Sequence, residues 1–84
     1  MLKCVAIDDE PLALEILQNY ARKSGLIDVV TTYTDTVTAK TFLEENNIDV
    51  LFLDIQMPDV NGLKFYEQLT QKPPVIFTTA YSQY

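Results

Sequence analysis

Acidic residues follow two apolar segments of the chain. Asp8, Asp9 and Glu10 come directly after the apolar run of residues 2–7, and Asp54 ends another such run. Two carboxylates about 4–5 Å apart repel by roughly 3–4 kcal/mol at an effective dielectric near 20, so acids that share a site require raised pKa values or a cation. Oxygen ligands in a small site suit Mg²⁺, and a carboxylate beside Mg²⁺ is a competent nucleophile for phosphoryl transfer.

The same acids also have a simpler interpretation. Asp at a strand end often caps a helix or forms a turn, and spacing alone favours this role over a metal site. Thr78 and Thr79 could bring hydroxyl groups to the same place, but threonine is common in strands. Cys4 is the only cysteine, so the chain has no internal disulfide, and its apolar neighbours favour a small buried side chain over a reactive thiol.

Apolar runs alternate with segments of helical periodicity. Short, nearly continuous apolar runs predict strands, here at residues 2–7, 27–33, 49–54 and 75–78 or 75–79. Helices are predicted between them, bounded by Pro11 and Gly25, by Thr34 or Asp35 and Asn46–Asn47, and by Asn61 and Pro73. The order βαβαβαβ predicts parallel strands with right-handed crossovers, and hence a three-layer α/β fold.

The inner faces of the helices follow from their apolar residues. We expect them to be Ala13, Ile16, Leu17, Tyr20 and Ala21 in the first helix, Ala39, Phe42 and Leu43 in the second, and Gly62, Phe65, Tyr66 and Leu69 in the third. Ligands of an open parallel sheet bind beyond the carboxyl ends of its strands. The acids of the first and third strands and the hydroxyls of the fourth are therefore expected at one edge.

Length and charge limit the kinds of function. Eighty-four residues form at most one small domain, and the formal net charge is −6. The basic residues are scattered, so this segment is a poor candidate for binding nucleic acid directly. No signal-peptide pattern and no apolar stretch long enough to cross a membrane is present in the sequence. We therefore expect the chain in the cytoplasm.

Three segments settle the choice of family. "VAIDDEPLALEIL", "DVLFLDIQMPDVNGL" and "PPVIFTTAY" resemble, in order and spacing, the signature blocks of the receiver domains of two-component response regulators. The wording "DDEPLA", "LDIQMP" and "FTTAY" further resembles receivers of LytTR-type regulators. The resemblance implies a flavodoxin-like sheet of order 2-1-3-4, with the family's fifth strand missing.

The resemblance also assigns roles to residues. It implies that Asp54 is the phosphoacceptor, that Asp9 binds Mg²⁺ directly, that Asp8 reaches it through water, and that the backbone carbonyl of Gln56 completes the metal site. Thr79 matches the switch hydroxyl, which turns toward the new phosphoryl oxygens, and Ala80 the small residue behind it. Met57, Pro58 and Gly62 match the loop that shapes the pocket, with Gly62 giving a sharp turn, and Glu10 is expected to cap a helix or to lie outside the direct metal ligands.

One feature of the family has no counterpart here. A full receiver continues through a further helix, strand and helix, and carries a lysine that pairs with the phosphoryl group. Lys64 and Lys72 lie on the wrong side of the third helix to replace it. We therefore expect residues 1–84 to be an incomplete receiver domain that is poorly phosphorylated, and that forms homodimers or exchanges strands through residues 75–84, because an apolar sheet edge pairs readily with another chain.

The implied function is that of a phosphoacceptor and not of an enzyme. The domain would take a phosphoryl group from a sensor histidine kinase and control its own output domain, of the LytTR DNA-binding type, and so regulate transcription. The alternative is an interaction module that is not phosphorylated. A phosphatase of the haloacid dehalogenase type would need an acid two residues after Asp54, where Gln56 stands, and a Rossmann nucleotide site would need glycines after the first strand.

Overall fold

The chain folds into four strands and three helices that alternate along the sequence. The computed structural model describes residues 1–58 and 60–78. The elements are β1 (Leu2–Ile7), α1 (Pro11–Ser24), β2 (Ile27–Tyr33), α2 (Thr36–Glu45), β3 (Val50–Asp54), α3 (Gly62–Glu67) and β4 (Val75–Thr78). Every element predicted from the sequence is present, and most bounds agree with the prediction to within about a residue. The exception is α3, which ends at Glu67, so that Leu69, predicted on its inner face, lies just beyond the helix.

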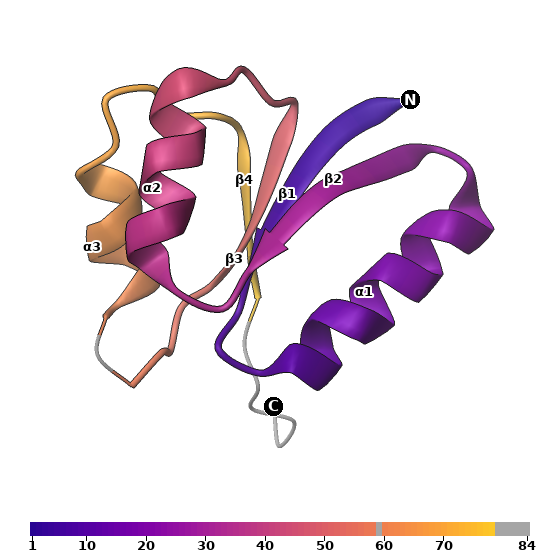
Figure 1. Cartoon of the computed structure of the whole chain (residues 1–84), viewed down its shortest axis with the longest axis horizontal. Helices are drawn as coiled ribbons and strands as arrows, with labels where there is room; N and C mark the ends of the chain where they lie inside the picture. The colour runs from indigo at the N-terminus through magenta and orange to yellow at the C-terminus, as the bar shows by residue number, and fades with distance from the viewer. Residues whose placement is uncertain (59, 79–84) are drawn as a thin grey trace.

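The strands form one parallel sheet of order β2-β1-β3-β4. Helix α1 covers one face of the sheet, whereas α2 and α3 cover the other (Figure 1). This arrangement confirms the three-layer, flavodoxin-like order that was predicted for the four strands. In the described part of the chain, no helix is long and apolar enough to cross a membrane.

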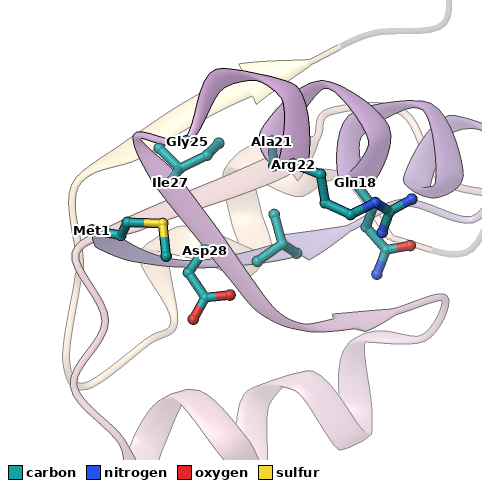
Figure 2. Close-up of a pocket in the computed structure, with 8 residues that line it drawn as sticks. Met1, Gln18, Ala21, Arg22, Gly25, Ile27 and Asp28 are labelled. Carbon is teal, nitrogen blue, oxygen red and sulfur yellow. The ribbon is translucent and has the colours of Figure 1, made fainter.

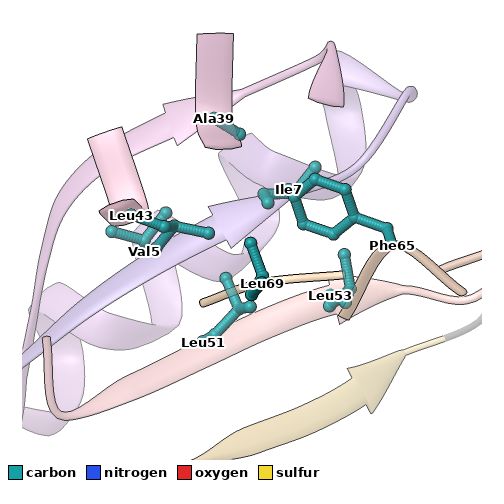
Figure 3. Packing of buried hydrophobic residues seen from close by; sticks show 8 residues of the cluster. All are labelled: Val5, Ile7, Ala39, Leu43, Leu51, Leu53, Phe65 and Leu69. Carbon is teal, nitrogen blue, oxygen red and sulfur yellow. The ribbon is translucent and has the colours of Figure 1, made fainter. Parts of the chain in front are cut away.

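The main core lies between the sheet and the helices α2 and α3 (Figure 3). The two central strands contribute Val5, Ile7, Leu51 and Leu53, which are at most 1% exposed. The other side contributes Ala39 and Leu43 of α2, Phe65 of α3, and Leu69 just after α3. Because β1 and β3 supply this core from neighbouring positions, their burial fixes the ends of both strands relative to each other.

Helix α1 presents to the sheet a face that overlaps the predicted one only in part, because Ala13, Leu17 and Ala21 of the predicted set are buried or half-buried. Leu14 and Ala21 are buried, whereas Ile16 and Tyr20 are 47% and 67% exposed. The sequence of α1 offers two overlapping apolar stripes, one through Leu14, Leu17 and Ala21 and one through Leu12, Ile16 and Tyr20. Periodicity does not distinguish these stripes, and packing on the sheet selects the first.

Local signals place the helix ends. The Asp35 carboxylate accepts a hydrogen bond from Thr38 N (2.8 Å), which caps α2. Gly25 ends α1 with φ 68°, a left-handed conformation that glycine adopts without strain. Glu10 occupies the N-cap position of α1 but makes no side-chain capping hydrogen bond, so the capping role considered for its carboxylate is wrong.

Candidate metal site

The pairing of β1 with β3 positions the acidic residues. The two strands are parallel neighbours, with Ile7 paired to Leu53. Asp8 therefore follows β1 at the level where Asp54 ends β3. The chain beyond each strand leaves the sheet at the same edge, as the carboxyl ends of parallel strands must.

Three carboxylates meet at this edge. Asp8, Asp9 and Asp54 each offer an oxygen atom, and these oxygen atoms lie within 4.8 Å of one another. Asp54 is only 2% exposed, whereas Asp8 and Asp9 are half-buried. The predicted convergence of the acids is confirmed, and a helix-capping role does not explain the approach of acids from two different strands.

Backbone hydrogen bonds orient two of these carboxylates. The Gln56 amide donates to Asp54 Oδ1 (3.1 Å), and the Glu10 amide donates to Asp8 Oδ1 (2.9 Å). The Asp8 amide in turn donates to the carbonyl of Tyr33 on β2 (3.1 Å). Each carboxylate thus accepts a hydrogen bond from the turn that follows its own strand, which limits the directions that it can take.

The environment of Asp54 disfavours its charged form. The pKa of Asp54 is raised from 3.8 to about 6, mainly by burial and also by the neighbouring Asp8 and Asp9, while the hydrogen bond from the Gln56 amide acts in the opposite direction. The site therefore holds more negative charge than its surroundings stabilise. A bound cation would remove this conflict.

The donor set fits Mg²⁺. Mg²⁺ prefers oxygen ligands, keeps several waters and is commonly held by one or two carboxylates. Asp8, Asp9 and Asp54 supply hard oxygen atoms that are close enough to share one ion, and the partial exposure of Asp8 and Asp9 leaves one side open to water. These three residues would hold the ion.

Only some of the remaining predicted site residues lie in the part of the chain that the structure describes. Gln56 lies beside Asp54 through its amide, while metal binding by its carbonyl stays a prediction. Thr79 and Ala80, predicted as the switch hydroxyl and its small neighbour, lie outside the described residues. Thr78 pairs with Asp54 in the sheet and lines a cavity of about 160 Å³ together with Asp8.

The loop after β3 forms a wall beside the acids. Met57, Pro58 and Val60 line a cavity of about 380 Å³ together with Asp9 and the residues that begin α2, as expected for a loop that shapes the pocket. Gly62, which was predicted to give a sharp turn, is the first residue of α3 and does not have a positive φ. It is instead pressed against the backbone of Asp54 and Ile55.

A larger pocket, of about 620 Å³, lies away from the acids (Figure 2). It sits between the C-terminal end of α1 and the start of β2, with Gln18, Arg22 and Asp28 among its lining residues. None of the three clustered acids lines it. Its mixed lining brings together no set of groups with an evident chemical role, so the acidic cluster remains the candidate site.

Comparison with known proteins identifies the family of the chain. Residues 4–84 match the response regulator receiver domain family. Over its full length the chain is 40% identical to an uncharacterized response regulatory protein of Vibrio vulnificus and 36% identical to the transcriptional regulatory protein BtsR of Escherichia coli. The chain belongs to the response regulator receiver domain family, and its relatives include proteins named as transcriptional regulators.

Solved structures show the same fold. TrrA of Thermotoga maritima, determined in complex with Mg²⁺–BeF, is 30% identical, with a TM-score of 0.82 over 100% of this chain and 74% of that chain. MaeR bound to beryllium trifluoride is 29% identical, with a TM-score of 0.83 over 99% of this chain and 70% of that chain. The chain spans 36% of the length of the curated relatives named above.

The raised pKa of Asp54 predicts how stability depends on pH without metal. Folding raises the pKa from 3.8 to about 6, so the native state binds more protons than the unfolded state between these values. The free energy of unfolding should therefore fall as pH rises from about 4 to above 6, by roughly 1–3 kcal/mol from this group. Urea unfolding at several pH values in EDTA measures the change.

Asp54→Asn should remove this part of the pH dependence and make the metal-free protein more stable than the wild type at pH 7. Asp28→Asn, at an exposed acid outside the cluster, is the matched control and should leave the profile unchanged. If the free energy of unfolding depended on pH equally in Asp54→Asn and the wild type, the raised pKa assigned to Asp54 would be contradicted.

Proposed function

We propose that this receiver domain accepts a phosphoryl group on Asp54, with Mg²⁺ held by Asp8, Asp9 and Asp54. The observation that carries the proposal is the approach of three carboxylate oxygens to within 4.8 Å around a residue that is 2% exposed. The complex of TrrA with Mg²⁺–BeF supports the pairing of such a site with a metal and a phosphoryl-like group.

The residues of this chain have separate tasks in the transfer. The Gln56 amide holds Asp54 Oδ1, which leaves the other carboxylate oxygen to attack phosphorus. The new bond joins Asp54 to phosphorus, while the bond from phosphorus to the donor imidazole breaks and the imidazole keeps the electron pair. Mg²⁺, when bound, neutralises charge on the transferred group. A phosphatase of the haloacid dehalogenase type would need a general acid two residues after Asp54, and Gln56 occupies that position.

We propose a sensor histidine kinase as the donor, and an output domain outside this chain as the target of control. The relatives named as transcriptional regulators support a role in transcription. The resemblance of the segments DDEPLA, LDIQMP and FTTAY to LytTR-type receivers supports a LytTR DNA-binding output domain. The chain spans 36% of the length of those relatives, so the rest of their length is sufficient for such a domain. A cytoplasmic location, and the treatment of residues 1–84 as an incomplete receiver, stay predictions.

Self-association through residues 75–84 is a second proposal, and a specific observation favours it. Strand β4 is an outer strand of the described sheet, and Ile76 on it is 50% exposed. An exposed apolar outer strand is a template for pairing with another chain. Such pairing would also serve a module that acts by interaction without phosphorylation.

Labelling with a small phosphodonor tests phosphorylation directly. Because residues 1–84 are expected to be poorly phosphorylated, we expect only part of the wild type to gain one phosphoryl group from acetyl phosphate in Mg²⁺, measured by intact-protein mass spectrometry, and none of it to gain one in EDTA. Asp54→Ala should gain none in either condition, whereas Asp28→Ala should behave as the wild type. Labelling of Asp54→Ala at the wild-type level would refute Asp54 as the acceptor.

Binding of Mg²⁺ should stabilise the fold. A ligand at one hundred times its Kd raises the free energy of unfolding by about 2.7 kcal/mol, so saturating Mg²⁺ should raise the urea midpoint of the wild type. Asp9→Asn should lose most of this gain, because it removes one of the clustered carboxylates. An unchanged midpoint for the wild type, with Ca²⁺ and Mn²⁺ equally without effect, would exclude the proposed cation site.

Self-association is tested by light scattering coupled to size exclusion. The wild type should show a mass that rises toward the dimer with concentration, and Ile76→Lys should remain a monomer, because a charge on an outer strand opposes pairing. Leu63→Lys, at an exposed leucine on α3, controls for the added charge. A wild type that stays monomeric at the highest concentration reached would refute this proposal.

A further inference from the structure

Gly62 occupies a place where the structure leaves no room for a side chain. It is buried at the start of α3, and its amide donates a hydrogen bond to the carbonyl of Ile55 (2.8 Å). A Cβ atom here would overlap the Asp54 carbonyl oxygen and lie 2.9 Å from Ile55 Cα and 3.1 Å from the Asp54 carbonyl carbon. All three are backbone atoms, which no change of rotamer can move aside.

The two elements that meet at Gly62 are both held in place. Helix α3 is anchored by Phe65, which is 5% exposed, and the segment that follows the helix is anchored by Leu69, which is 1% exposed. The side chain of Asn61 caps the first turn of α3. On the other side, β3 is paired with β1 and β4, and the amide of Ile55 donates to the carbonyl of Thr78 (3.0 Å). Neither element can retreat without loss of core packing or sheet hydrogen bonds.

Gln56 directly follows the backbone that Gly62 contacts. Gln56 is exposed, so movement of the backbone here loses little packing. Its amide, however, is the group that holds Asp54 Oδ1 (3.1 Å). A displacement of the Asp54–Ile55 peptide would therefore shift the Gln56 amide and change the hydrogen bond that orients the Asp54 carboxylate.

We infer that Gly62 is a positioning residue for Asp54: its lack of a side chain lets α3 dock onto the Asp54–Ile55 peptide and hold the Gln56 amide against the carboxylate. This inference rests on the proposed function for its importance to phosphoryl transfer. Its structural part, the coupling of position 62 to the Gln56–Asp54 hydrogen bond, stands without a metal or a phosphodonor.

The test compares two glycine variants. Gly62→Ala places a Cβ against the Asp54 backbone. Gly25→Ala, at a glycine with φ 68° and no atom within 4 Å of an added Cβ, is the matched control, because it strains the backbone far from the acids. Urea unfolding reports the stability of each variant, so that effects on the site can be compared at similar losses of stability.

The metal-free readout is hydrogen exchange of the Gln56 amide, measured by NMR in EDTA. We expect Gly62→Ala to speed this exchange by about tenfold or more relative to neighbouring loop amides, and Gly25→Ala to leave the ratio unchanged. Equal ratios in Gly62→Ala and the wild type, with the variant folded, would overturn the inference.

The second readout is the affinity for Mg²⁺, measured by calorimetry, with the rate of labelling by acetyl phosphate. Misplacement of a reacting group by about 1 Å can cost on the order of a hundredfold in rate. Gly62→Ala should therefore be labelled at least about tenfold more slowly than the wild type and should bind Mg²⁺ more weakly. Gly25→Ala should match the wild type in both measurements. Wild-type affinity and rate in Gly62→Ala would also overturn the inference. A wild type that neither binds Mg²⁺ nor is labelled would refute the proposed function, while the Gln56 exchange still decides the inference.

The Gly62→Ala variant could fail to fold in buffer. All measurements are then repeated for the three proteins in sucrose, which favours the compact state. A variant that stays unfolded there overturns the inference, because the contact would then be required for folding as a whole and not for placing Asp54.

Discussion

The structure depends on the parallel pairing of β1 with β3. This pairing buries Val5, Ile7, Leu51 and Leu53 in one core, and the same register brings Asp8 and Asp9 beside Asp54. The apolar residues fix a geometry that the acids oppose by repulsion. Burial of apolar side chains thus holds charge together at the sheet edge, and the raised pKa of Asp54 is the result of that conflict.

This conflict is also what gives the site its chemistry. A carboxylate that is buried beside two others is stabilised by a cation, and the cation that the donor set suits is the one that assists phosphoryl transfer. The turn after β3 then orients the carboxylate through the Gln56 amide, and α3 presses on that turn through Gly62. In the proposed function, core packing, metal affinity and reactivity would therefore depend on the same few backbone contacts.

Most of the fold and the acidic cluster could be predicted from the sequence. Continuous apolar runs and the turn residues Gly25, Asp35 and Asn61 define the elements, and strand order then places the acids. The inner face of α1 could not, because Leu14 and Ile16 belong to stripes of equal periodicity and only packing on the sheet distinguishes them. The role of Gly62 could not either, because the sequence marks a glycine in a loop but does not show that this loop folds the glycine back onto the backbone of Asp54 and Ile55.

The central claim is that Asp8, Asp9 and Asp54 form one cation site, and the most direct measurement is an anomalous difference map from crystals soaked in Mn²⁺. The account predicts a single strong peak within coordination distance of carboxylate oxygens from Asp9 and Asp54. A map with no peak between them, and with these carboxylates directed into separate regions of solvent, would contradict it.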